Sequence, residues 1–103
     1  MQQNRGDNRY ATRVNLRFTA VLREVGSSFK FTVDIIDLSS TGFRCETASR
    51  VEVGQHVSVT IPGLSPLEGV VAWVDGPRFG CKFERPLYAA VFDHIAARFK
   101  AAG

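Results

Sequence analysis

Two short clusters of polar residues carry chemistry suited to an anionic ligand. In "NRYATRVNLRF", Arg9 and Arg13 are four positions apart and stand just before an alternating apolar run. Further along, "DIIDLSSTGFR" places Asp37, Ser39 and Gly42 in the spacing D-x-S-x-x-G. An arginine guanidinium is a planar fork of donors that pairs with phosphate through two hydrogen bonds, and a carboxylate and a hydroxyl add further hydrogen-bonding groups. Together the two clusters predict a site for an anion that also has a hydrogen-bonding edge.

Each cluster also has a purely structural interpretation. A polar chain end that contains arginines is commonly just solvated. Asp37 and Ser39 could instead hydrogen-bond to nearby backbone in a turn, with Gly42 supplying a positive φ. The conjunction of both clusters with the pattern of strands and helix described below favours the ligand-binding interpretation.

The sequence lacks the motifs of common enzyme active sites, since it contains no G-x-S-x-G, no H-E-x-x-H and no phosphate-binding P-loop. His56 and His94 have no visible catalytic partners, and both are expected at the surface. Cys45 and Cys81 have no C-x-x-C spacing and do not complete a four-ligand zinc site with the histidines. They are expected as reduced thiols packed in strands, with a disulfide as the alternative. We therefore expect a binding module rather than an enzyme, with no metal and no cofactor.

Composition narrows the class of protein further. The chain has 103 residues, of which 45% are hydrophobic and 22% charged, as fits one folded domain. Its net charge of +3 is far from the dense basic stripe of a duplex DNA binder. It has neither an apolar run of about 18 residues nor the apolar region of a signal peptide. We expect a cytoplasmic protein that inserts into no membrane and binds neither DNA nor RNA.

These residues must be positioned by a predominantly β domain. Residues 1–13 show no hydrophobic period and are expected to form a flexible arm that carries the arginine pair. From residue 14 onward, apolar residues alternate with polar ones in short runs separated by Gly, Pro and Ser. The predicted strands are 14–23, 29–36, 42–47, 57–61, 66–76 and 78–84, with "DLSSTG" interrupting the chain between the second and the third. Such a pattern predicts an antiparallel sheet closed into a small barrel or a sandwich.

The period changes near the C-terminus. In "PLYAAVFDHIAARFKAAG" apolar residues recur at steps of three and four, which predicts an amphipathic helix over about residues 86–101. Pro86 suits its first turn and Gly103 its end. The residues of its apolar face, expected to pack over one opening or face of the barrel, are Tyr88, Val91, Phe92, Ile95 and Phe99.

Trp73, in "VAWVDG", has two possible roles. Strand aromatics usually pack in a core, and we expect this ring to pack in or over the barrel. The alternative is a ring that lines the ligand site and stacks on a base.

The arrangement of Arg9-x-x-x-Arg13, Asp37-x-Ser39-x-x-Gly42, six strands and a helix resembles the PilZ domain, a bacterial module that senses cyclic di-GMP. The runs "EGVVAWV" and "GCKFE" are similar to late strands of that family, and the resemblance covers residues 8–100. It implies a six-stranded antiparallel β-barrel with a C-terminal helix across residues 14–103. Barrel closure is implied by the resemblance and not by the periodicity.

The resemblance also implies roles for individual residues. Arg9 and Arg13 would bind the phosphates and the O6/N7 edge of guanine as the arm folds over the ligand. Asp37 would accept guanine N1–H and N2–H or orient an arginine, Ser39 would face the same side, and Gly42 would allow a close approach.

Two further residues are expected at the periphery of the ligand. Asn8 occupies a position where family members often have another basic residue, and Trp73 would join it if its ring is exposed.

The expected function is that of a cyclic di-GMP receptor that changes conformation on binding and signals to a protein effector. One alternative is a PilZ-like adaptor domain that binds protein only. The other is a small basic β-barrel for single-stranded nucleic acid, a class that places exposed aromatic residues along a basic groove.

Overall fold

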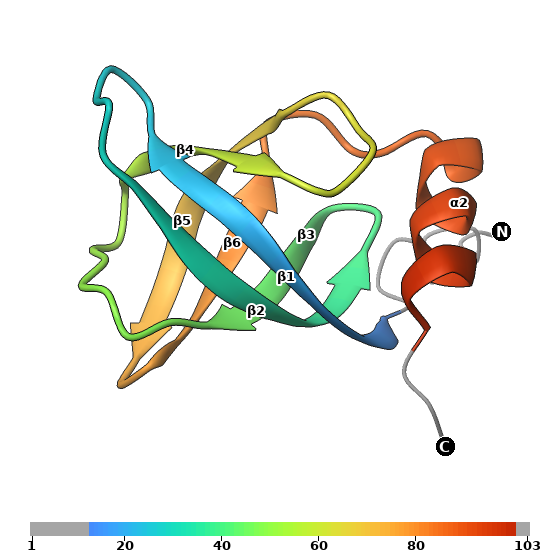
Figure 1. The fold of residues 1–103 in the computed structure, drawn as a ribbon, viewed down its shortest axis with the longest axis horizontal. Helices are drawn as coiled ribbons and strands as arrows, with labels where there is room; N and C mark the ends of the chain where they lie inside the picture. The colour runs from blue at the N-terminus through green and yellow to red at the C-terminus, as the bar shows by residue number, and fades with distance from the viewer. Residues whose placement is uncertain (1–12, 101–103) are drawn as a thin grey trace, which may run out of the picture.

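The structure is a computed structural model that describes residues 13–100. Six antiparallel strands close into a barrel in the order β1-β2-β3-β6-β5-β4, and one helix packs beside it (Figure 1). The elements are β1 (Val14–Glu24), β2 (Lys30–Ser39), β3 (Gly42–Glu46), β4 (His56–Thr60), β5 (Leu67–Asp75), β6 (Arg78–Phe83) and α2 (Ala89–Phe99). The predicted six-stranded barrel with a C-terminal helix is confirmed.

The core is built from the inward side of each strand, as the alternation predicts. In β1, Leu16, Ala20 and Leu22 are buried, while the residues between them are exposed or half-buried. The remaining buried apolar residues come from the other strands, the residue after β4 and the helix: Val33, Ile35, Leu38, Phe43, Cys45, Val57, Val59, Ile61, Val71, Phe79, Cys81, Phe83 and Ile95. At about 25 cal/mol for each Å² of apolar surface removed from water, this continuous interior is the main stabilising term of the barrel.

Strand β2 is longer than the sequence indicates. It runs through Asp37 to Ser39, so only Ser40 and Thr41 form the connection to β3. The register with β3 shifts between Ile35 and Asp37, which marks a β-bulge. Without it, strict alternation would put Asp37 on the same inward side as Ile35; with it, Leu38 points inward and Asp37 lies on the outer face.

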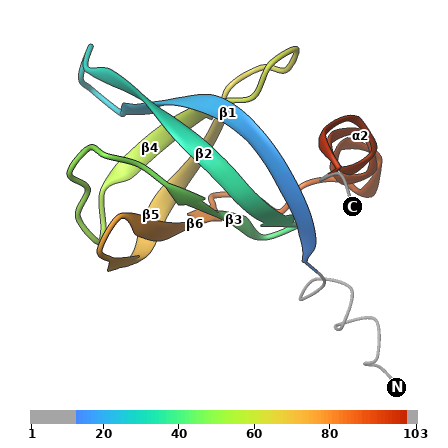
Figure 2. The same ribbon diagram turned by 60° about the horizontal axis from the view of Figure 1, so that its bottom comes forward.

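The helix begins at Ala89, after Pro86 rather than at it. Ile95 is fully buried, and Phe99 stacks on Phe18 of β1 with ring centroids 4.1 Å apart and planes inclined by 26°. Figure 2 shows α2 outside the barrel wall, close to the first part of β1. The helix therefore covers part of the barrel at the end where β1 begins.

Tyr88 does not join the apolar face of α2, and that expectation is wrong. Its side chain is 83% exposed. Tyr88 is the N-cap residue, with extended φ and ψ of −62° and 148°, so it stands outside the helical repeat that orients the other apolar residues. The residue before it, Leu87, donates its backbone N–H to the carbonyl of Ser40 at 2.8 Å, which holds the chain against the β2–β3 turn just before the helix starts.

Candidate functional site

A buried carboxylate between two guanidinium groups forms the centre of the site. Arg13 Nη1 donates to Asp37 Oδ1 at 2.8 Å, and Arg44 Nε donates to Asp37 Oδ2 at 2.5 Å, with Arg44 Nη2 also in contact. The Asp37 side chain is 1% exposed, whereas those of Arg13 and Arg44 are 43% and 47% exposed. Two cations share one anion, so the outer surface keeps a net positive charge with donors that still face solvent.

Asp37 holds both arginines from below, which is one of the two roles expected for it. Asn15 of β1 and Arg44 of β3 are its partners in the sheet register, so the carboxylate lies between two neighbouring strands. The hydrogen bond from Arg44 to Asp37 and the charge of Asp37 both raise the pKa of Arg44, whereas the slight burial of Arg44 lowers it. The pair therefore fixes a permanently charged group at this point of the surface.

Arg44 is a candidate site residue that the sequence interpretation missed. It follows Gly42 by two residues in "GFRCE", and its neighbours Phe43 and Cys45 both point into the core. Alternation therefore indicates that Arg44 points outward. Its pairing with Asp37 could not be read from the sequence, because it depends on the β2 bulge and the β2–β3 register.

Ser39 lies beside the site, and its side chain is engaged in the turn. Its Oγ accepts the backbone N–H of Thr41 at 3.2 Å, lies 3.1 Å from Thr41 Oγ1, and is placed to donate to the carbonyl of Gly42 at 3.4 Å. This geometry is the hydrogen-bonded turn foreseen as the structural interpretation of the motif. Ser39 thus braces the β2–β3 connection.

Gly42 is required by packing and not by a positive φ. The glycines with positive φ among the described residues are Gly26, Gly54, Gly63 and Gly76. A Cβ on Gly42 would overlap the backbone carbonyl oxygen of Cys81 in β6. The last position of D-x-S-x-x-G therefore lets β3 and β6 approach closely beneath the site.

Trp73 lies on the outer face of the barrel, so its ring packs over the barrel and not in its core. A register shift between Val71 and Trp73 leaves Val71 buried and turns Trp73 outward, where it is 38% exposed. Its indole lies against Gly80 so closely that a Cβ on that glycine would overlap the indole nitrogen. Gly80 is also the register partner of Arg44. Trp73 and Arg44 therefore flank the same glycine in the sheet.

These residues form one row across five strands. Asn15 pairs with Asp37, Asp37 with Arg44, Arg44 with Gly80, and Gly80 with Trp73. The row offers cations at one end and an exposed aromatic ring at the other. Such a surface can bind a ligand that combines phosphate with a planar base.

Comparison with known proteins shows the family of the chain. The sequence model of the PilZ domain matches residues 3–98. The chain belongs to the PilZ domain family. Among solved structures, it is similar to the crystal structure of the PilZ domain of CeSA from a cellulose-synthesizing bacterium. The TM-score is 0.59 at 13% sequence identity, over 84% of this chain and 92% of that one. No curated protein sequence matches it.

PilZ domains are in general modules that bind cyclic di-GMP. Of the residues expected at the ligand here, the structure brings Arg13 and Asp37 together and places Ser39 and Gly42 in the adjacent turn. Trp73 lies on the same outer face. Arg9 and Asn8 lie outside the described residues.

The remaining chemically active side chains of this PilZ domain suit structural roles. His56 and His94 are exposed, as expected. Cys45 and Cys81 are buried and unpaired. Burial raises the pKa of Cys81 to about 12, and burial together with nearby negative charge raises that of Cys45 as well. Both thiols are therefore held protonated and unreactive in the barrel.

The described part of the chain offers neither a cluster of metal ligands nor a membrane-spanning helix. Across residues 13–100, no group of three or more His, Cys, Asp or Glu side chains is arranged to hold a metal ion. The same stretch contains no helix long and apolar enough to cross a membrane.

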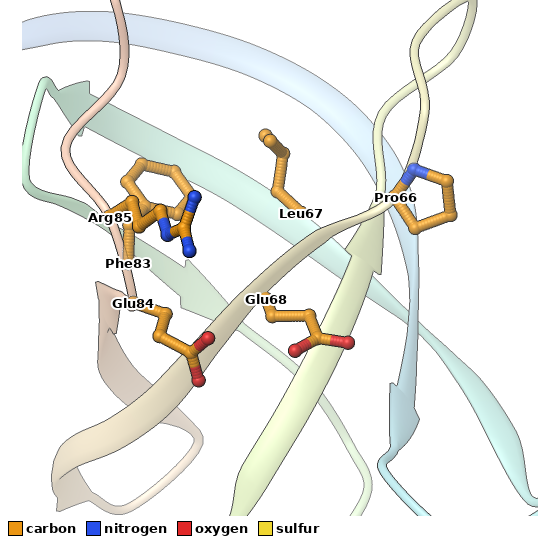
Figure 3. Close-up of a pocket in the computed structure, with 6 residues that line it drawn as sticks. All are labelled: Pro66, Leu67, Glu68, Phe83, Glu84 and Arg85. Carbon is orange, nitrogen blue, oxygen red and sulfur yellow. The ribbon is translucent and has the colours of Figure 1, made fainter.

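A hollow of about 210 Å³ lies between the start of β5 and the end of β6 (Figure 3). Leu67 and Phe83 give it apolar walls, and the carboxylates of Glu68 and Glu84 both lie on one side of it. Arg85 is the single cation among its six lining residues. Two carboxylates repel a dianionic ligand, so this hollow is not the anion site.

Proposed function

We propose that this PilZ domain is a receptor for cyclic di-GMP that acts by binding and not by catalysis. The observation that carries the proposal is the pair of half-exposed arginines held on a buried aspartate, in register with an exposed tryptophan. Cyclic di-GMP has two phosphates in a ring and two guanine bases. The site on the barrel supplies guanidinium groups that suit the phosphates and an aromatic ring that suits the bases.

Arg13 and Arg44 suit the phosphates and the guanine edges. A guanidinium pairs in bidentate fashion with phosphate, and equally with guanine O6 and N7, and it stacks on a base face. Because Asp37 already fixes the orientation of both arginines, less side-chain entropy is lost when the ligand binds. In this proposal Arg9 joins them from the N-terminal arm, with Asn8 beside it.

Trp73 suits a guanine face. Its indole lies against Gly80, and the residue is 38% exposed. Stacking of a base on such a ring contributes about 1–3 kcal/mol. The tryptophan would thus hold one base while the arginines hold the phosphates.

Calorimetric titration with cyclic di-GMP tests the proposal directly. We expect saturable binding that neither GTP nor a single-stranded oligonucleotide displaces. Displacement by the oligonucleotide would instead indicate a single-strand-binding barrel. Absence of binding by the intact domain would overturn the receptor proposal.

A second candidate is a PilZ-like adaptor that binds protein alone. It is favoured by the internal hydrogen bonds of Asp37 and Ser39, which leave both side chains satisfied without a ligand. In the receptor proposal, binding draws the arm onto the barrel and creates a composite surface of arm, ligand and β-sheet for a protein effector. In the adaptor alternative, the effector binds equally with and without cyclic di-GMP.

A further inference from the structure

We infer that Lys82 forms a second anion subsite on the same face and selects ligands with two phosphates over those with one. This inference rests on the proposed function. It starts from the position of Lys82 in β6, where Cys81 and Phe83 on either side are both buried in the core. Alternation then places the exposed Lys82 on the outer face, with Gly80 and Arg78.

The register puts Lys82 diagonally opposite Arg44. Arg44 pairs with Gly80, and two residues further along β6, Lys82 pairs with Gly42. The four outward positions of this part of β3 and β6 are therefore two cations on one diagonal and two glycines on the other. Diagonal neighbours in an antiparallel pair are roughly 7–8 Å apart. Two long cationic side chains thus border a stretch of sheet without side chains of its own.

Both glycines are constrained by their surroundings. The indole of Trp73 occupies the space beside Gly80, and the backbone of β6 occupies the space beside Gly42. No larger residue fits at either position without displacing a neighbour. The two glycines between Arg44 and Lys82 are therefore required by packing, and both are buried.

The arginines on this face have carboxylate partners, whereas Lys82 differs from them. Arg44 shares Asp37 with Arg13, and Arg78 donates from Nε to Glu46 Oε2 at 2.6 Å. Among the described residues Lys82 has no such ion pair with a carboxylate. An ammonium is a compact point charge that binds phosphate without the geometric demands of a guanidinium. With Arg13 and Arg44 at one phosphate, Lys82 is placed for the other.

Two charge-matched variants test the inference. Lys82→Gln removes one positive charge beside Gly42 and Gly80, and Lys30→Gln removes one from an exposed position at the start of β2, at the opposite end of that strand from the β2–β3 turn. By calorimetry, Lys82→Gln should weaken cyclic di-GMP about three- to tenfold, as fits loss of one exposed charged contact. Lys30→Gln should leave the affinity within about twofold, and Lys82→Arg should restore it.

GMP, which has a single phosphate, distinguishes a subsite from a general loss of positive charge. Lys82→Gln should reduce the preference of the domain for cyclic di-GMP over GMP, because GMP fills the arginine subsite alone. Equal affinities for cyclic di-GMP in the Lys82→Gln and Lys30→Gln variants would overturn the Lys82 inference while leaving the receptor proposal intact. Failure of the unmodified domain to bind cyclic di-GMP would overturn both.

Discussion

The two arginines on Asp37 differ from ordinary surface cations because their anionic partner is buried. Exposed ion pairs contribute little to stability, since both ions are well solvated when apart. Here the carboxylate is 1% exposed and receives donors from both sides, so it sets where two guanidinium groups stand. The arrangement orients the arginines more than it stabilises the fold.

Arg13→Ala should weaken cyclic di-GMP by at least about tenfold, because a charge-assisted hydrogen bond contributes about 1.5–3 kcal/mol. Its half-exposed side chain makes removal tolerable to the fold. Arg50→Ala is the control, since Arg50 is also an exposed arginine but lies in the connection between β3 and β4, away from the row of site residues. Calorimetry on both variants gives the comparison. Unchanged affinity in a folded Arg13→Ala protein would count against the site.

The Asp37→Ala variant tests whether Asp37 serves mainly to orient the two arginines or to stabilise the fold. Loss of the buried acceptor should lower the free energy of unfolding by about 1–2 kcal/mol, since the arginines it leaves can be rehydrated. A domain with a typical stability of at least about 5 kcal/mol would remain almost entirely folded. A tenfold loss of affinity at the same time could not then come from unfolding. Thermal melts and titrations of this variant, with Glu46→Ala as the exposed control, show whether affinity falls more than stability.

At the scale of elements, regular alternation was predictable and its interruptions were not. β1 follows its sequence period closely, and its buried residues are those expected from the pattern. The bulges in β2 and β5 turn Asp37 and Trp73 to the outer face, and both depend on pairing with partner strands. The sequence therefore predicts the barrel strands and the candidate residues Arg13 and Asp37, but not Arg44, its pairing with Asp37, or the face on which Trp73 lies.

Gly42→Ala should disturb the packing of β3 against β6. The added methyl would overlap the Cys81 carbonyl, so one strand must shift, at a cost of about 1–3 kcal/mol. Because Arg44 and Lys82 stand on these strands, affinity for cyclic di-GMP should also fall.

Gly26→Ala is a suitable glycine control, because Gly26 belongs to the β1–β2 hairpin turn. Its φ of 89° strains any other residue by about 1–2 kcal/mol. An added Cβ would meet no atom within 4 Å apart from its chain neighbours. The substitution should lower the melting temperature and leave the affinity unchanged. If Gly42→Ala also leaves affinity unchanged, the close approach of β3 and β6 serves only the fold.

At the scale of the whole molecule, the buried thiols link stability to pH. The pKa of Cys81 rises from 9.0 to about 12 in the folded barrel, and that of Cys45 also rises, chiefly through burial. Above about pH 9 the unfolded chain loses thiol protons that the native state keeps, so stability falls as pH rises. Below that pH neither state changes its thiol charge, and the cysteines give no pH dependence.

Denaturant unfolding at about pH 8 and about pH 10 measures this fall. A Cys45→Ala/Cys81→Ala protein should lose part of the alkaline decrease seen in the unmodified domain. A thiol reagent at about pH 8 should label the native protein only as fast as the barrel opens. Rapid labelling without unfolding would show that the thiols are accessible.

Binding should also involve the chain that precedes the barrel. Arg13 already stands at Asp37, and Arg9 is four residues earlier, so a ligand that contacts both must draw residues 9–13 against the outer face. Fixing each residue costs about 1–2 kcal/mol of conformational entropy, which ionic contacts and stacking must offset. Trypsin, which cuts after arginine, reports the change. Saturating cyclic di-GMP should slow cleavage after Arg9 and Arg13, with a smaller effect after Arg5.

Arg50 supplies an internal control for the same digest, because it is exposed in the connection between β3 and β4, away from the row of site residues. Its cleavage rate should not depend on the ligand except through global stabilisation, which acts by mass action and amounts to about 2.7 kcal/mol at a hundredfold excess over the Kd. Protection confined to the first arginines would show that the arm becomes ordered when the ligand binds. Equal cleavage rates after Arg9 and Arg13 with and without bound ligand would show that the arm is not the element that changes on binding. The signal would then have to leave through the outer face of β3 and β6 or through α2, whose start is tied to the β2–β3 turn by the hydrogen bond from Leu87 to Ser40.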